Sequence, residues 1–292
     1  MHLLKKIWRV GWDAFWQFNA DDGWAIASHI ALSSLMAMFP FFLVLTALAG
    51  MIGSQYLADE AASLVLEAWP EEVAGPISRE IHNVLVGAHG QVLTVGVALA
   101  LYFASSGVES LRIGLNRAYG TVEPRAWWLM RLESIGYVLV AAAAILAFSF
   151  LVVLAPLIWT KLVHFVPTLE PLSDLITFAR YAVAVIVLVI ALTIVHMWLP
   201  AGRRSIGAIA PGILATLLLW LVSGAAFGRY LANFAFAYIS MYAGLASAMI
   251  ALIFLYVCAS IFIYGGELNA MIAKEREKER EKEREKERTE TP

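Results

Sequence analysis

The chain has 292 residues, of which 61% are hydrophobic and 15% are charged, and its formal net charge is −2. Soluble domains are roughly 45–50% apolar and about 25% charged, so this composition excludes an ordinary soluble enzyme. The small net charge also provides no basic surface that would attract nucleic acid. The one cysteine, Cys258, cannot form an intrachain disulfide or a cysteine-based zinc site.

The first segment, residues 1–20, has the pattern of an amphipathic helix. One helical face is apolar and the other basic and polar; the apolar face holds Leu4, Ile7, Trp8, Trp12, Phe15 and Trp16. This arrangement is typical of a helix lying in the surface plane of a membrane. We therefore expect an interfacial amphipathic helix at this end of the chain.

Six stretches that follow are apolar enough, over about 20 residues each, to cross a bilayer as helices. They are residues 29–53, 92–109, 135–159, 178–199, 206–228 and 242–266. The sequence thus predicts an all-α fold, a polytopic membrane domain of six transmembrane helices over residues 21–273.

Lysine and arginine are retained on the cytoplasmic side of a membrane during insertion. With the N-terminus inside, the cytoplasmic segments hold nine basic residues and the opposite side four, before the C-terminal tail is counted. We therefore expect both termini to be cytoplasmic.

Two segments outside the membrane have distinct compositions. Residues 54–91, the first outer connection, are acidic and amphipathic, and Pro70 and Pro76 divide them into two expected short helices. They form either a soluble cap or a gate or docking element. The charged cytoplasmic tail, residues 274–292, repeats Lys-Glu-Arg-Glu and is expected to be a solvated, partly helical extension, or a contact for a partner or lipid surface.

Polar groups within or beside the spans are costly in a membrane and are therefore the first functional candidates. Most fall on the cytoplasmic half and would line one polar vestibule if the helices meet; they are Ser33, Ser34, Glu109, Arg112, Asn116, Glu267 and Asn269. Two alternatives stay open. Glu109 and Arg112 are spaced as an i,i+3 ion pair at the membrane edge, and Glu267 is placed where it could mark the water boundary. His29 and His196 are expected to be singly hydrogen-bonded residues near helix ends rather than metal ligands.

Small residues and prolines indicate where spans bend or approach closely. Pro40 and Pro211 each remove a backbone donor inside a span and can kink it. Gly224 and Gly228 form a GxxxG pattern that allows close helix packing, within the chain or in a homo-oligomer.

Motifs of catalysis are missing from the sequence. It contains no HExxH, GxSxG, P-loop or dinucleotide fingerprint, and no cytoplasmic segment long enough for a catalytic domain. We therefore expect a protein that is not an enzyme, with no metal and no cofactor.

Several motifs resemble those of the YihY/BrkB family of bacterial inner-membrane proteins. They cover residues 20–272 and comprise the Ala31–Pro40 segment, Leu115–Gly120, Gly207-Ala208, Trp220, Tyr242–Leu245 and Gly265–Asn269. The resemblance implies an inner-membrane protein of six spans with both ends cytoplasmic. It also implies a role in transport, which is suspected for the family. Some members carry the name ribonuclease BN, and the resemblance implies that this name is a misassignment.

Three functional hypotheses follow. The first is a transporter or permease for a lipid or other envelope-related small molecule. The second is a non-catalytic scaffold that recruits an envelope-assembly protein, and the third, more distant, is an RNA-processing nuclease. The partners expected are membrane lipids and not nucleic acid. The candidate path or substrate-binding residues are Ser33, Ser34, Pro40, Glu109, Arg112, Asn116, Tyr242, Gly266, Glu267 and Asn269.

Overall fold

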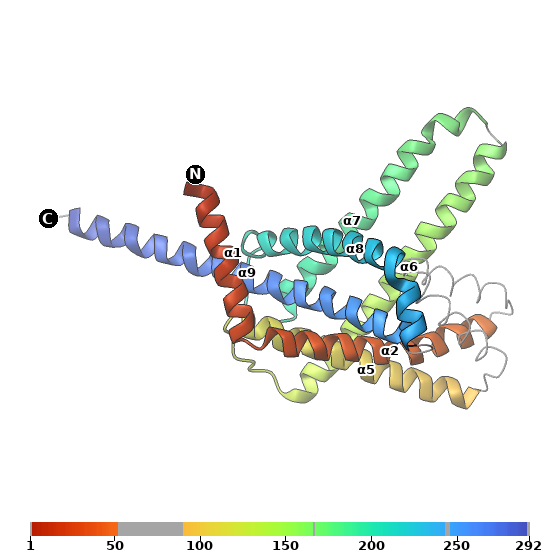
Figure 1. The fold of residues 1–292 in the computed structure, drawn as a ribbon, viewed down its shortest axis with the longest axis horizontal. Helices are drawn as coiled ribbons and strands as arrows, with labels where there is room; N and C mark the ends of the chain where they lie inside the picture. The colour runs from red at the N-terminus through yellow and green to blue at the C-terminus, as the bar shows by residue number, and fades with distance from the viewer. Residues whose placement is uncertain (1, 52–89, 166, 243–245, 291–292) are drawn as a thin grey trace.

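The computed structural model describes residues 2–51, 90–165, 167–242 and 246–290, and the regular structure within these ranges is entirely helical. Its elements are α1 (His2–Ala20), α2 (Gly23–Met51), α5 (Gly90–Ala118), α6 (Trp127–Phe165), the 3-10 helix η1 (Pro167–Leu172), α7 (Ser173–Trp198), α8 (Ile206–Tyr242) and α9 (Ala246–Glu290) (Figure 1). The all-α prediction is confirmed for these residues. The short helices expected within residues 54–91 lie outside them.

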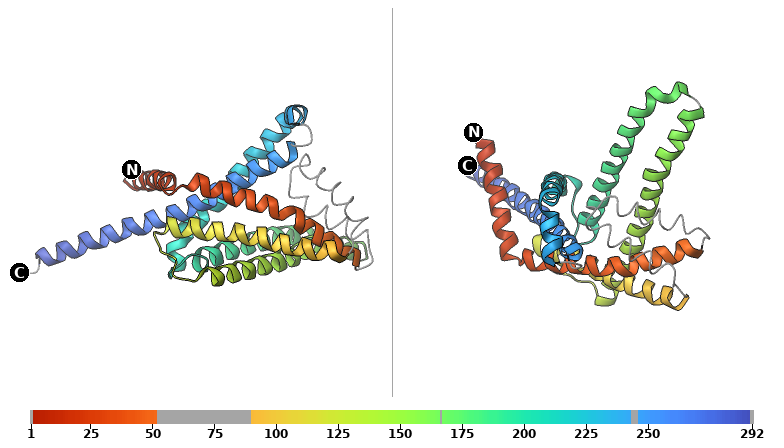
Figure 2. Two further views of the ribbon diagram at one scale, coloured as in Figure 1. Left: turned by 90° about the horizontal axis from the view of Figure 1, so that it is seen from below. Right: turned by 45° about the vertical axis from the view of Figure 1, so that its right-hand side comes forward.

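Helix α9 is the element around which the others are arranged. Helices α2 and α5 pack along each other, and both contact α9, which also packs against α8. Helix α1 crosses α9, while α6 and α7, joined by η1, form a hairpin whose far end projects from the other helices (Figure 2). The ends of α5, α7 and α8 therefore meet beside the middle of α9.

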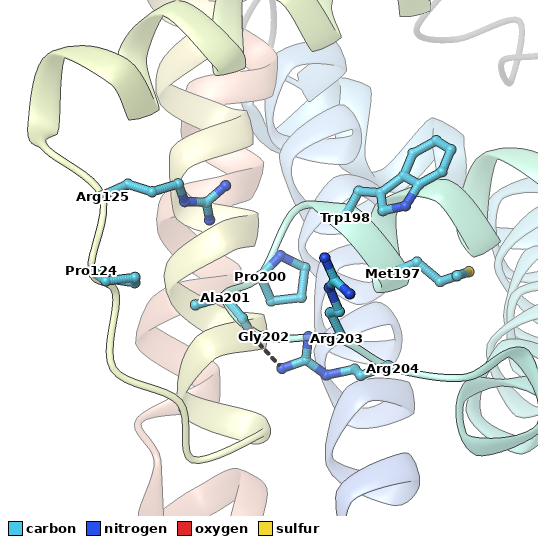
Figure 3. A pocket seen from close by; sticks show the side chains of 9 residues that line it. All are labelled: Pro124, Arg125, Met197, Trp198, Pro200, Ala201, Gly202, Arg203 and Arg204. Carbon is cyan, nitrogen blue, oxygen red and sulfur yellow. Dashed lines mark hydrogen bonds between the residues drawn. The ribbon is translucent and has the colours of Figure 1, made fainter.

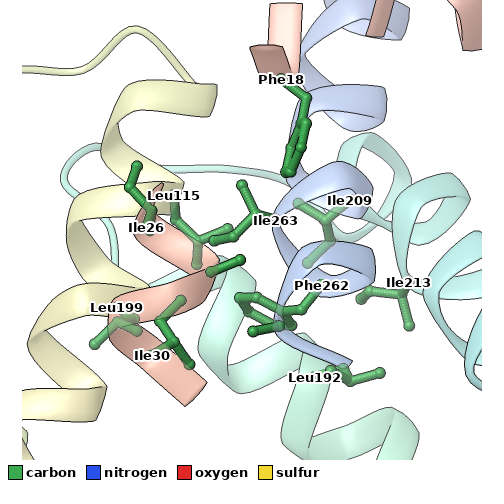
Figure 4. Close-up of a cluster of buried hydrophobic side chains, with 12 residues drawn as sticks. Phe18, Ile26, Ile30, Leu115, Leu192, Leu199, Ile209, Ile213, Phe262 and Ile263 are labelled. Atoms are coloured by element: carbon green, nitrogen blue, oxygen red, sulfur yellow. The ribbon is translucent and has the colours of Figure 1, made fainter. Parts of the chain in front are cut away.

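The main apolar core lies at this meeting point. It contains side chains from six helices and from the α7–α8 connection (Figure 4), namely Phe18, Ile26, Ala27, Ile30, Leu115, Leu192, Leu199, Ile209, Ile213, Ala259, Phe262 and Ile263. Burial of such branched and aromatic side chains is the main favourable contribution to packing outside lipid contact. The core thus holds together the helix ends from which the candidate polar residues project.

Four helices in the described ranges are long and apolar enough to cross a membrane: Thr94–Ala118, Glu170–Trp198, Ile206–Asn233 and Ser247–Arg288. Gly23–Met38 is a shorter apolar helix. The expected span 135–159 lies within α6, but the side chains of residues 144–158 fall outside the described part. The count of six spans stays a prediction.

The C-terminal charges continue α9 instead of starting a separate segment. Glu275 and Glu279 form ion pairs with Arg9 and Lys6 of α1, so the first turns of the tail hold α1 against α9. The opposite face of α1 exposes Trp8 and its neighbours along the helix. The helix expected at residues 1–20 is therefore present, and its position in the membrane interface stays a prediction.

Helices α8 and α9 approach closely where two glycines face each other. A Cβ atom at Gly212 of α8 would lie 2.1 Å from the carbonyl oxygen of Gly265 of α9, so the two backbones touch there. The GxxxG pattern behaves differently, because a Cβ at Gly224 or Gly228 would meet no described atom within 4 Å. Close packing within the described chain thus uses Gly212 and Gly265, and not the GxxxG pair.

Candidate functional site

The C-terminal end of α5 positions the first polar residues of the site. Gly120 has a φ of +60°, which glycine adopts without strain, and it ends the helix in a Schellman motif. In that motif the Gly120 amide donates to the Arg117 carbonyl and the Thr121 amide to the Asn116 carbonyl, each at 2.9 Å. The chain reversal fixes Asn116 and the residues that follow it beside the α7–α8 connection.

Asn116 is buried, and every polar atom of its side chain is used. Its Nδ2 donates to Glu123 Oε2 at 2.9 Å. Its Oδ1 accepts from Thr121 Oγ1 at 3.1 Å and from the Ala201 backbone amide at 2.7 Å. One side chain thus joins α5, the α5–α6 loop and the α7–α8 connection.

Two arginines bind the same carbonyl oxygen, that of Leu199. Arg112, 2% exposed, donates to it from Nε at 3.4 Å, and Arg125 donates to it from Nη2 at 2.9 Å. Both arginines also pair with Glu133 of α6, at 3.3 Å and 2.7 Å. A buried cation is costly unless it is paired, so these bonds account for the position of Arg112 inside the bundle.

Glu123 is the acid that completes this arrangement. Arg125 donates to both of its oxygens, at 2.6 Å and 2.8 Å. These hydrogen bonds to Arg125, supported by the one from Asn116, lower the pKa of Glu123 from 4.5 to about 2. Glu123 is therefore ionised at neutral pH and is a fixed structural anion.

A second group of hydrogen bonds surrounds Tyr119. Asn269 Nδ2 donates to the Tyr119 hydroxyl at 3.3 Å, and that hydroxyl lies 3.0 Å from His196 Nδ1. Asn269 Oδ1 accepts from the Gly212 amide at 2.6 Å. The Arg204 guanidinium lies 3.9 Å from the centre of the Tyr119 ring and donates to the Ala201 carbonyl at 2.8 Å.

Ala201 connects the two groups, because its amide bonds to Asn116 and its carbonyl to Arg204. We call the connected set the polar network. Its side chains are Arg112, Asn116, Tyr119, Glu123, Arg125, Glu133, His196, Arg204 and Asn269. It joins one end of the bundle across α5, α6, α7 and α9.

Some buried polar atoms remain unpaired. The Tyr119 hydroxyl lies against one ring nitrogen of His196, Nδ1, while the other, Nε2, is buried with no partner among the described residues. The Thr216 hydroxyl and the two carboxyl oxygens of Glu267 are also buried, and no described residue donates a hydrogen bond to them in the recorded geometry. Glu267 is 0% exposed, the carboxyl of Asp21 lies within hydrogen-bond reach of its own carboxyl, and Lys274 is the cation that acts on it.

Three successive residues of α9 contact three different neighbours. A Cβ at Gly265 would meet Thr216 of α8, and one at Gly266 would meet Leu115 at 2.9 Å and His196 at 4.0 Å. Glu267 projects toward the end of α1, where Asp21 lies. Glu267 is therefore on a different face of α9 from Asn269 and does not hydrogen-bond to the polar network.

The remaining predicted residues lie elsewhere. Ser33 and Ser34 face Gly107 of α5, and Pro40 is buried inside α2. Tyr242 is the last residue of α8, and its side chain is outside the described part. Of the ten candidates, Arg112, Asn116 and Asn269 belong to the network, and Gly266 lies against it.

Glu109 and Arg112 do not form the i,i+3 pair that their spacing allows. Glu109 Oε2 accepts from Arg131 of α6 at 2.7 Å, whereas Arg112 pairs with Glu133. Each charge is thus satisfied across the α5–α6 contact. Glu109 and Arg131 line a separate cavity of about 590 Å³ beside His29, whose Nδ1 hydrogen-bonds to the Ser110 hydroxyl.

Sequence reasoning missed several residues of the network. Tyr119 was visible within the Asn-x-x-Tyr motif, and Glu123 and Arg125 flank a proline in a short polar loop. Arg204 counted only as a positive charge. Their roles depend on contacts with helices up to 150 residues away in the chain.

A cavity of about 440 Å³ adjoins the network between the α5–α6 loop and the α7–α8 connection (Figure 3). Its lining comprises Pro124, Arg125, Met197, Trp198, Pro200, Ala201, Gly202, Arg203 and Arg204. The charged residues of that lining are all arginines. Among the described residues, no group of three or more His, Cys, Asp and Glu side chains is close enough to hold a metal ion.

Comparison with known proteins places this geometry in context. The family model described as virulence factor BrkB matches residues 14–290. YfkH of Bacillus subtilis, whose name calls it ribonuclease-like, is 24% identical over 277 residues, which cover 95% of this chain and 97% of that protein. A UPF0761 membrane protein of Rhodospirillum centenum is 27% identical over 271 residues, or 90% of this chain and 56% of that relative. No solved structure matches the chain.

Proposed function

Because this chain belongs to the BrkB family of membrane proteins, we propose that it is a transporter or permease for a lipid or other envelope-related small molecule. The proposal includes a location in the bacterial inner membrane with both termini in the cytoplasm. The excess of arginine in the connections that carry the polar network supports this orientation. The protein acts without a catalytic site or a cofactor.

The observation that carries the proposal is the burial of Glu267 beside a second carboxyl, that of Asp21, with no basic or amide side chain of the described residues donating to it. Burying a polar group without a hydrogen-bond partner costs about 1–3 kcal/mol, and burying a charged group costs more. A buried carboxyl of this kind therefore needs a specific explanation. Ionisable groups within membrane helices most often serve a substrate or ion path. We assign to Glu267 the binding of a polar group of the transported molecule, close to the α1–α2 junction.

The backbone of α8 beside Asn269 of α9 contains a feature that can permit movement of this helix. Pro211 removes one backbone hydrogen-bond donor from α8. The next backbone amide, that of Gly212, donates to the side chain of Asn269 on α9. Broken or kinked helices near binding sites recur in transporters. The Gly212–Asn269 bond is therefore the contact that we expect to change when the path opens.

The first experiment identifies the substrate and then measures flux. Lipids and metabolites are compared between deletion cells and complemented cells, and the altered compound is assayed in proteoliposomes containing the full-length protein. Glu267→Gln keeps the shape of the side chain but replaces its ionisable carboxyl by an amide, so we expect flux to fall at least tenfold. Full flux in this variant, at normal insertion, contradicts the site assignment.

A matched control separates the buried site from general charge effects. Glu283→Gln removes one acid from the exposed part of the same helix, α9, and is expected to leave flux unchanged. An equal loss in both variants would indicate that the net charge of α9, and not the buried carboxyl, controls the activity.

A second candidate function is a scaffold in which the charged tail recruits an envelope-assembly protein. The ion pairs from Glu275 and Glu279 to α1 require two truncations. Removing residues 282–292 keeps both ion pairs to α1, whereas removing residues 274–292 deletes them and releases α1. Loss of function in the shorter truncation favours the scaffold, and loss confined to the longer one favours the membrane body.

The nuclease alternative has one direct test. Purified protein supplemented with divalent metal is incubated with RNA, beside the Glu267→Gln variant. Cleavage by the unaltered protein that disappears in the variant would replace transport by an enzymatic function.

A further inference from the structure

Two arginines of the α7–α8 connection, Arg203 and Arg204, have no acidic partner in the part of the chain that the structure describes. Arg112 and Arg125 are matched by Glu123 and Glu133. Arg203 is exposed and Arg204 is half-buried, and neither forms an ion pair with a carboxylate of the described residues. Both line the cavity of about 440 Å³, where they leave two positive charges without compensation.

Arg204 has a buried guanidinium nitrogen that lacks a hydrogen-bond acceptor among the described residues. Its Nη2 donates to the Ala201 carbonyl and its guanidinium stacks on Tyr119, but Nη1 is buried without a partner in the described part of the chain. A cation withdrawn from water without an anion is destabilised. An anion in the adjoining cavity would remove that penalty.

The geometry points to a phosphate group as the occupant. The planar guanidinium of arginine matches phosphate oxygens in pairs of charge-assisted hydrogen bonds. Arg203 projects from the connection beside Pro200 and Trp198, with Arg125 on the far side of the opening (Figure 3). The volume is within the range of about 300–1,000 Å³ for small-molecule sites. We propose that this cavity binds the phosphate of an anionic membrane lipid.

The surroundings favour a lipid over free phosphate as the source. Trp198, 61% exposed, ends α7 at the mouth of the cavity, and tryptophan side chains favour the headgroup level of membranes. Upstream of it, residues 183–190 of α7 expose valine, leucine and isoleucine side chains. Acyl chains can therefore lie along α7 while the phosphate contacts Arg203 and Arg204. This site is separate from Glu267, and the inference holds whether or not the protein transports.

Binding is measured on the full-length protein in detergent by native mass spectrometry and by thermal stabilisation. The probes are phosphatidylglycerol, diacylglycerol with the same chains, and inorganic phosphate. We expect phosphatidylglycerol to bind and to raise the melting temperature, and Arg203→Gln to weaken its binding about tenfold. The double variant Arg203→Gln/Arg204→Gln should abolish the stabilisation.

Arg117→Gln is the matched control, because it removes one exposed arginine that pairs with Asp22 and does not line the cavity. It should bind phosphatidylglycerol as the unaltered protein does. Stabilisation by inorganic phosphate that requires Arg203, without an effect of lipid, supports a phosphate site and overturns the lipid source. Equal binding of diacylglycerol, or unchanged phosphatidylglycerol binding by folded Arg203→Gln protein, overturns the proposal. Failure of the Glu267 flux experiment leaves these outcomes unaffected.

Discussion

The side-chain oxygen of Asn116 accepts a hydrogen bond of 2.7 Å from the backbone amide of Ala201, 85 residues farther along the chain. This bond joins the end of α5 to the connection between α7 and α8. Because the Ala201 carbonyl bonds to Arg204, the contact also joins the two halves of the polar network. Together with the bonds from Arg112 and Arg125 to the Leu199 carbonyl, this contact holds the connection that lines the arginine-lined cavity.

Replacing Asn116 by leucine should destabilise the protein. The Ala201 amide would lose its acceptor, and Glu123 would lose one donor, so we expect a loss of about 1–3 kcal/mol in the free energy of unfolding. The measurement is reversible unfolding in mixed micelles. Asn233→Leu, at an exposed position of α8, is the control and should change the value by less than about 0.5 kcal/mol.

The ion pair between Glu123 and Arg125 predicts a pH dependence. The pKa of Glu123 is about 2 in the folded protein and 4.5 ordinarily. The unfolded chain therefore takes up the proton first, and the stabilisation is present above about pH 4.5 and is lost as the pH falls toward 2. The melting temperature of unaltered protein should exceed that of Glu123→Gln at pH 6. The gap should narrow through this window, and a gap that does not depend on pH contradicts the assigned pKa.

The contact between Gly212 and Gly265 predicts opposite effects for the same substitution at two places in α8. Gly212→Ala would place a methyl group against the Gly265 carbonyl and should cost about 1–3 kcal/mol through overpacking. Gly224→Ala meets no described atom within 4 Å, so it should be neutral or stabilise by up to about 1 kcal/mol. The two variants are compared by thermal unfolding. If only Gly224→Ala destabilises the protein, the close helix contact lies at Gly224 and not at Gly212.

A double-mutant cycle distinguishes the two possible partners of Glu109. The bond to Arg131 is partly exposed, so its coupling energy should be about 0.2–1 kcal/mol. The cycle of Glu109→Gln with Arg112→Gln should give a smaller coupling, because Arg112 pairs directly with Glu133 and Glu109 acts on it only through space. Unfolding free energies of the single and double variants provide both values. If Glu109 is coupled to Arg112 and not to Arg131, the ion pair that forms is the i,i+3 pair.

The candidate residues illustrate how far local sequence reasoning extends. Asn116 and Asn269 are candidates because polar groups in apolar segments are costly, and both side chains use their donor and acceptor atoms in bonds to other segments of the chain. Glu123, Arg125 and Arg204 were missed as site residues because loop charges are ordinarily solvated. Only their proximity to Asn116, Leu199 and Tyr119 gives them structural roles.

The sequence by itself determined the all-helical class, the approximate places of the long apolar helices and the family, since hydrophobic length and composition are local properties that a membrane constrains directly. The tertiary structure decided which charges pair, which glycines touch and which polar atoms are left without partners. Glu109 pairs with Arg131 and not with Arg112, and α8 contacts Gly265 of α9 through Gly212 and not through its GxxxG pair. Such choices depend on the rotation and depth at which helices distant in sequence pack, which no single helix specifies.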